Sequence, residues 1–119
     1  MKRKSNQKGF TLVELIIVIA ILGVLAALLV PRIMGNLESA QKNKEISNAR
    51  TIASEISTYN AIQKVNNGTL FIPGGGGTLS DTDLAAAPAQ IRVDTADFPD
   101  PSIVTIEIDS AGNASIDIK

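Results

Sequence analysis

The sequence of 119 residues contains no cysteine, no histidine and no tryptophan. Without cysteine, the chain can form no disulfide and has no thiolate metal ligand or thiol nucleophile. Without histidine, it lacks the commonest general base and the commonest metal ligand. The remaining polar residues show no catalytic dyad. We therefore expect no catalytic residue, no metal site and no cofactor, and a protein that is not an enzyme.

Acidic residues are absent from the start of the chain and abundant towards its end. The first nine residues carry four basic side chains and no acid, whereas the rest carries seven basic and twelve acidic side chains. From Val65 onwards there are eight acidic residues and two basic residues, Arg92 and Lys119. Such an acidic segment repels a phosphate backbone, so no nucleic-acid partner is expected.

Polar residues are also missing from a long stretch near the N-terminus. Residues 15–30 read LIIVIAILGVLAALLV, and the most polar of them is Gly23. As a helix, residues 10–30 measure about 32 Å, enough to cross a hydrocarbon core of about 30 Å. The Leu, Ile and Val side chains favour insertion by about 4–7 kcal/mol, which exceeds the cost of about 3 kcal/mol for one acid, Glu14. The basic residues before the span predict a cytoplasmic N-terminus and an outward-facing C-terminal part.

Two ordinary interpretations compete for this N-terminus. A secretory signal peptide would need a small-residue cleavage site after the apolar run, and Ala26-Ala27-Leu28 is a poor version that still lies inside it. The run is also longer than the usual signal sequence. A plain single-pass membrane anchor explains everything except Gly9-Phe10 and the acid Glu14.

The stretch Gly9-Phe10-Thr11-Leu12-Val13-Glu14-Leu15, the apolar run after it and Pro31 together resemble the type IV pilin family, which includes the type II secretion pseudopilins. The resemblance covers roughly the first third of the chain. It implies that a prepilin peptidase cuts between Gly9 and Phe10 and N-methylates Phe10. It also implies that Glu14 neutralises the positive Phe10 terminus of a neighbouring subunit, with Thr11 alongside.

The resemblance further implies that the chain moves from membrane lipid in the inner membrane into an extracellular homo-oligomeric helical filament, with the help of pilus assembly machinery. The leading hypothesis is a structural subunit of a type IV pilus. A pseudopilin of a type II secretion or DNA-uptake system, and a membrane-anchored binding module that never polymerises, remain open. The Cys-bracketed C-terminal loop that is common in the family is absent.

Beyond the span, the spacing of apolar residues predicts that the helix continues. Pro31 would disrupt a helix interior, but helical periodicity resumes at once, so we expect a kink at Pro31 instead of a helix end. Asn66-Asn67-Gly68 supplies a stop signal near Val65. The expected apolar stripe of the outer half consists of Ile46, Ala49, Ile52, Ala53, Ile56, Tyr59 and Ile62.

The C-terminal residues alternate in a way that is typical of strands. Residues 103–109 and 114–118 predict a β-hairpin with a turn at 110–113, and residues 90–93 are a candidate third strand. Ser80 is expected to cap a short helix over residues 81–87. The predicted fold class is α+β, with a long bent N-terminal helix, membrane-spanning in its first half, packed against a small antiparallel sheet.

Two further patterns carry weaker signals. Residues 73–77, Pro followed by four Gly, predict a flexible loop, and no P-loop lysine follows them. The acids Asp81, Asp83, Asp94, Asp97 and Asp100 could supply oxygen ligands for Ca²⁺, but their spacing fits no EF-hand. A solvated acidic loop is the favoured interpretation.

The sequence thus divides into four expected segments. Residues 1–9 form a cleaved basic leader, and residues 10–30 form the transmembrane and fibre-core helix. Residues 31–65 continue that helix as an amphipathic segment. Residues 66–119 form a small, acidic, β-rich domain.

Overall fold

The computed structural model describes residues 8–119, so most of the predicted leader, residues 1–7, lies outside the described residues. The chain divides into two compact units between Glu38 and Ser39. One helix, α1 (Leu12–Val65), contributes to both units. The predicted helix therefore exists, and it begins two residues later than expected.

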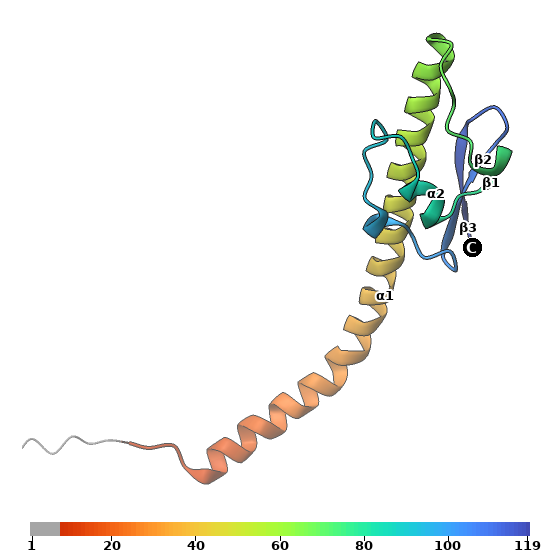
Figure 1. Cartoon of the computed structure of the whole chain (residues 1–119). Coiled ribbons are helices and arrows are strands. Elements are labelled where there is room, and N and C mark those ends of the chain that lie inside the picture. Colours follow the sequence, from red (N-terminus) through yellow and green to blue (C-terminus); the bar gives the residue numbers. More distant parts are fainter. Residues whose placement is uncertain (1–7) are drawn as a thin grey trace, which may run out of the picture. The chain divides into compact units, whose positions relative to one another are not determined.

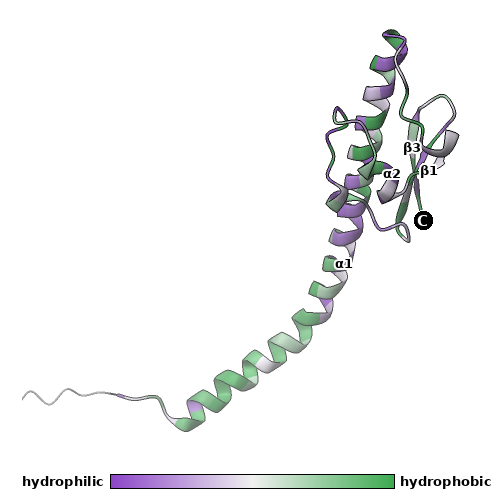
Figure 2. Cartoon of the chain, in the orientation of Figure 1, coloured by the Kyte–Doolittle hydropathy of each residue, from purple (hydrophilic) through white to green (hydrophobic). Residues whose placement is uncertain are grey.

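The first unit consists of the N-terminal part of α1 and the few described residues before it. Every described residue up to Glu38 is exposed. Figure 2 shows this part of α1 as almost uniformly hydrophobic, without the alternation seen further along the helix. Pro31 lies inside the helix, so the alternative in which the helix ends there is wrong. The kink at Pro31 stays a prediction.

The second unit packs the later part of α1 against a three-stranded antiparallel sheet (Figure 1). The strands are β1 (Gly77–Thr78), β2 (Val104–Ile108) and β3 (Ala114–Ile118), in the order β1-β2-β3. The predicted hairpin is confirmed, with Ile106 opposite Ile116 in the register. The α+β fold class is confirmed as well.

The core lies between one face of α1 and the inner face of β2. Ala49, Ile52 and Ile56 recur at helical spacing and are buried. Val104, Ile106 and Ile108 alternate along β2 and are buried, as the period of a half-buried strand requires. Leu79, Leu84 and Ile91 come from the connecting segments and complete this cluster.

Ile62 was expected in the buried stripe, and that prediction is wrong. Its side chain is 53% exposed. At about 100° per residue, Ile62 lies roughly 120° around the helix from Ile56, away from the sheet. Asn60 lies closer to the core face and is only 1% exposed, so a polar residue occupies the place that the pattern assigned to an apolar one.

The third strand was also placed wrongly. The structure has no strand at residues 90–93, where the Ile91 N–H donates to the Pro88 carbonyl and the Ile91 side chain enters the core. The third strand is β1, in which Gly77 pairs with Ile108. The loop predicted at residues 73–77 is therefore partly ordered, as the short helix η1 (Pro73–Gly75) followed by β1.

The short helix α2 (Asp81–Ala85) forms behind its predicted cap and ends two residues earlier than expected. The Ser80 side chain accepts from the Asp83 N–H, and the Asp83 carboxylate accepts from the Ser80 N–H at 3.0 Å. The Ser80 hydroxyl also donates to Asp83 Oδ2 at 2.6 Å, and this hydrogen bond together with the one from the Ser80 N–H lowers the pKa of Asp83. A second short helix, η2 (Thr95–Asp97), is capped by Asp94.

Candidate processing and assembly site

The candidate site is the start of α1, where Thr11 is the N-cap residue. The Thr11 N–H donates to Glu14 Oε2 at 2.9 Å, and the Glu14 N–H donates to Thr11 Oγ1 at 3.3 Å. This reciprocal pair is a capping box, which satisfies two backbone donors that a helix start otherwise leaves unpaired. The capping box explains why α1 begins at Leu12 and not at Phe10.

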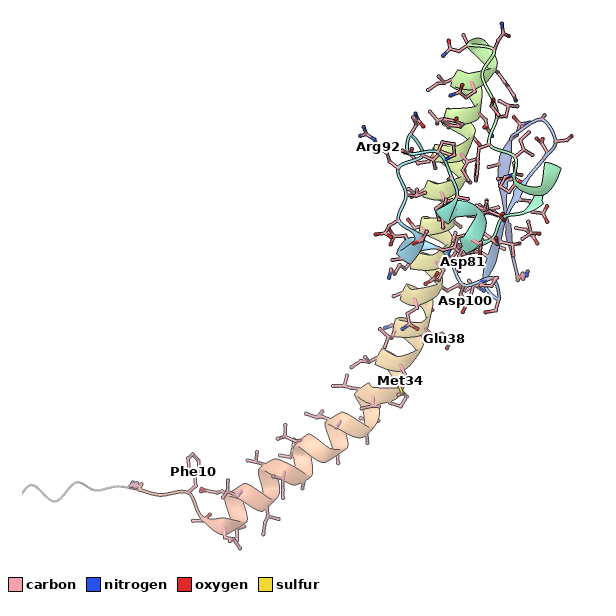
Figure 3. The ribbon with its side chains drawn as sticks, in the orientation of Figure 1. Phe10, Met34, Glu38, Asp81, Arg92 and Asp100 are labelled. Atoms are coloured by element: carbon pink, nitrogen blue, oxygen red, sulfur yellow. The ribbon has the colours of Figure 1, made fainter. Side chains whose placement is uncertain are left out.

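Phe10 and Leu15 occupy the flanking positions of a hydrophobic staple, one before the cap and four after it. Both line the same shallow hollow on the helix surface, together with Glu14, Ile17 and Val18. Phe10 nevertheless keeps 86% of its surface exposed, and Figure 3 shows its ring projecting from the chain. The single chain therefore leaves this aromatic side chain available to another molecule.

The Gly9–Phe10 peptide bond lies outside α1 in an exposed stretch with no regular structure. A Cβ atom added at Gly9 would meet nothing within 4 Å among the described residues. Packing within the chain therefore gives no reason for glycine at this position. A requirement for glycine would have to come from a partner that binds the chain closely here.

Glu14 is an isolated negative charge at the N-terminal end of α1. The helix dipole favours a carboxylate there, because the free N–H groups carry partial positive charge. Within the described residues, Thr11 is the one hydrogen-bond partner of the Glu14 carboxylate, through Oε2. The other carboxylate oxygen, Oε1, has no donor within residues 8–119.

The apolar side chains of residues 15–30 are all exposed in the part of the chain that the structure describes. Their exposure runs from 49% at Leu25 to 67% at Leu28. By length and composition, α1 is the one helix of the described residues that could cross a membrane. Pro31 lies far along this helix from Glu14, so the structure does not bring it into the site.

Four of the five acids weighed as calcium ligands, Asp81, Asp83, Asp94 and Asp100, accept hydrogen bonds from nearby residues. Asp94 accepts the Ala96 N–H at 2.9 Å, and Asp100 accepts the Ser102 N–H at 2.8 Å. The Ser102 donors lower the pKa of Asp100. No group of three or more acids in residues 8–119 lies close enough together to hold a metal ion.

The capping box is the feature that our sequence analysis missed. We assigned Thr11 and Glu14 to contacts between subunits and gave them no role inside the chain. The pattern Thr-x-x-Glu ahead of an apolar run is a readable signal for a helix start. The structure thus brings Thr11 and Glu14 together, and it places Phe10 at the same end of the helix.

The described geometry can now be compared with known proteins. Residues 4–30 match the family model of the prokaryotic N-terminal methylation motif. The chain carries a prepilin-type N-terminal motif. Gly9, Phe10, Thr11 and Glu14 all lie inside the matched residues. No solved structure matches the chain significantly.

Curated relatives come from two kinds of system. Type II secretion system core protein G of Dickeya chrysanthemi is 51% identical over 56 residues, which are 47% of this chain and 37% of that protein. The same protein of Escherichia coli K12 is 44% identical over 59 residues, 50% of this chain and 41% of that protein. The type IV major fimbrial protein FimA of Dichelobacter nodosus is 37% identical over 83 residues, 70% of this chain and 53% of that protein. The chain thus spans between about two fifths and one half of these relatives.

Proposed function

We propose that this chain is a structural subunit that is cut between Gly9 and Phe10, N-methylated at Phe10, and polymerised into a helical filament of the type IV pilus kind. The observation that carries the proposal is the apolar part of α1, which is exposed on all sides and follows a prepilin-type motif. A prepilin peptidase, the membrane lipid and a pilus assembly machinery are the partners that this function requires.

Hydrophobic burial supplies the driving force for assembly. Lipid covers the segment around Leu25 and Leu28 while the subunit waits in the inner membrane with its N-terminus in the cytoplasm. Outside the membrane, only other copies of the same segment can cover it. Contacts between offset, identical helices are heterologous, so they propagate as a filament and do not close into a dimer.

Glu14 has a second task in this proposal. Cleavage after Gly9 gives Phe10 a positively charged amino terminus at the same helix end as the Glu14 carboxylate. Oε2 is held by Thr11, which leaves Oε1 to accept a hydrogen bond from the Phe10 ammonium of a neighbouring copy. An ion pair in the apolar interior of a filament is costly to break, because either charge alone is left uncompensated.

The two kinds of relative support two versions of this function. The match to the fimbrial protein extends over more of the chain, and it favours a pilus on the cell surface. The higher identities belong to the type II secretion proteins, and they favour a pseudopilus that serves secretion. Deletion of the chain separates the two: loss of surface filaments in electron micrographs identifies a pilus, and loss of secreted proteins from the medium identifies a pseudopilus.

Intact mass spectrometry of the membrane-extracted protein tests the processing step. We expect a species that lacks the first nine residues and carries one added methyl group on Phe10. An uncut Met1 terminus in cells with an active prepilin peptidase would contradict the processing step and leave the membrane-anchored binding module as the remaining interpretation.

Replacement of Glu14 by Ala tests the assembly step. The variant should still insert into the membrane, and its free energy of insertion should become more favourable by up to about 3 kcal/mol, because an acid is removed from the hydrocarbon. Surface filaments should fall at least tenfold, since an unpaired ammonium in the filament interior costs about 3–5 kcal/mol per contact. The matched control is Glu38→Ala, which removes an exposed acid further along α1. Normal filament yield from Glu14→Ala would remove the proposed role of Glu14.

A further inference from the structure

Two apolar patches on α1 lie outside the proposed membrane span and are exposed among residues 8–119. The middle patch consists of Ile33, Met34 and Leu37, which are 60%, 68% and 58% exposed. The distal patch consists of Ile62 and Val65, which are 53% and 84% exposed. Neither patch is explained by insertion into lipid, because the span of about 20 residues is complete at Val30.

The distal patch has the form of a groove on the second unit. Thr58, Ala61 and Asn66 line a shallow hollow together with Ile62 and Val65. The small side chain of Ala61 leaves room beside the two larger apolar residues. This face of α1 is turned away from the sheet, so the core described above does not use it.

The middle patch has the form of a ridge. Ile33 and Leu37 are four residues apart, so they lie on one face of the helix with Met34 beside them. Figure 3 shows the Met34 side chain projecting from α1. A methionine adapts its shape to irregular apolar surfaces, which suits a contact of this kind.

Between Leu37 and the distal groove, the exposed residues of α1 are polar or charged except for Ala40. They are Glu38, Ser39, Ala40, Gln41, Lys42, Asn43, Lys44, Ser47, Arg50, Thr51 and Ser54. If two copies are laid side by side without a shift, each patch meets its own counterpart. If they are shifted along the helix by 29 residues, the spacing from Ile33 to Ile62, the ridge of one copy meets the groove of the other.

We propose that the middle patch of one copy packs into the distal groove of a second copy in the filament. This proposal rests on the proposed polymerisation and specifies its stagger. The two patches are different surfaces, so the contact is heterologous, as filament growth requires. Each contact is small, and the apolar segment before Pro31 supplies the larger part of the burial.

Cysteine cross-linking tests the stagger directly, because the chain has no cysteine of its own. The variant Ile33→Cys/Ile62→Cys, whose two positions are separated by the proposed stagger, should give a ladder of covalent multimers on a denaturing gel after treatment of intact filaments with a mild thiol oxidant. Each single variant should give dimers at most, and reduction should restore the monomer. The control Ile33→Cys/Ala111→Cys moves the second thiol to the exposed turn between β2 and β3, and it should give no ladder above the single variants.

The outcomes separate the stagger from polymerisation itself. Filaments with a ladder for the first pair alone support the stagger. Filaments with no ladder, or with equal ladders for both pairs, overturn it. If Ile33→Cys/Ile62→Cys does not assemble, Leu37→Cys/Asn66→Cys, which keeps the spacing of 29 residues, replaces it under the same criteria. A wild-type chain that is processed but never forms filaments contradicts the proposed function, and the stagger falls with it.

Discussion

Replacing Asn60 by Ala should destabilise the second unit, residues 39–119, more than any other polar-to-alanine change on α1. Asn60 Nδ2 donates to the Gly112 carbonyl at 2.7 Å and to the Phe71 carbonyl at 3.0 Å, and Oδ1 accepts from the Phe71 N–H at 2.7 Å. One side chain thus ties α1 both to the segment that follows it and to the β2–β3 turn. Each hydrogen bond contributes about 1 kcal/mol net, so the loss is about 3 kcal/mol, and unpaired buried groups add to it.

A loss of this size is a large fraction of the stability of a small domain, about 5–15 kcal/mol. For a unit of this size, 3 kcal/mol lowers the melting temperature by roughly 10–25 °C. The assay is denaturation of the full chain in detergent, followed by circular dichroism and fitted with a linear dependence on denaturant. Asn43→Ala, at an exposed position on the same helix, is the control and should change the free energy of unfolding by no more than about 0.5 kcal/mol. A value for Asn60→Ala equal to that of the control would refute the reasoning.

Three further predictions follow from the described contacts. Gly112→Ala should lower the free energy of unfolding by about 1–3 kcal/mol, because Gly112 has a φ of 81° and an added Cβ would lie 2.9 Å from Asn60 Nδ2. The double variant with Asn60→Ala should lose less than the sum of the two single losses, and strict additivity would argue against the clash. Asp109 has a lowered pKa, because the Asn113 backbone and side-chain N–H groups donate to it, helped by the Ala111 N–H and by Lys64. The contribution of ionised Asp109 to stability should be present above the unfolded pKa of about 3.9 and be lost as the pH falls through the folded value. Thermal melts from pH 7 to 3 should therefore show Asp109→Asn less stable than wild type only at the higher pH. Thr11→Val should fray the first turn of α1 at a cost of about 1 kcal/mol, whereas Thr11→Ser should not; faster amide exchange in both variants, or in neither, would show that the Thr11 hydroxyl does not act as a cap.

The long helix and the hairpin could be predicted because their signals are local. The apolar periodicity of α1, the stop at Asn66-Asn67-Gly68 and the alternation in residues 103–109 each depend on a few neighbouring residues. At the helix stop, the Gly68 N–H donates to the Gln63 carbonyl at 2.9 Å, and Asn67 has a φ of 50°. Because these contacts join residues that are close in the sequence, the sequence pattern can predict them.

The errors involve residues whose partners are distant in the sequence. Asn60 is buried because it meets Gly112, 52 positions away, and no local pattern indicates that contact. Strand β1 is only two residues long and contains Gly77, which has low strand propensity; its pairing with Ile108 depends on the tertiary fold. Residues 90–93 have a better strand composition, yet Ile91 is used as a core anchor at a turn.

The candidate site was predicted in part. The residues around Gly9 and Phe10 were found from their resemblance to a family, and that resemblance says nothing of their geometry within one chain. The hydrogen bonds between Thr11 and Glu14 follow from helix-capping chemistry, which the sequence expresses and which we did not apply. The contact of Glu14 with a second copy stays a prediction, because it involves atoms of another molecule.

The two edges of the small sheet bear on whether neighbouring copies could pair through their strands. An open strand edge invites pairing with another chain, and a filament would hold its domains at very high local concentration. At one edge, β1 offers only two residues. At the other, the Ala114 N–H of β3 already donates to Ser57 Oγ of α1 at 3.2 Å, and the charged residues Asp117 and Lys119 flank Ile118. Strand pairing between the sheets of different copies is therefore disfavoured, while the exposed surface of α1 remains available for packing between helices. Order in an assembly can then arise from helix contacts alone.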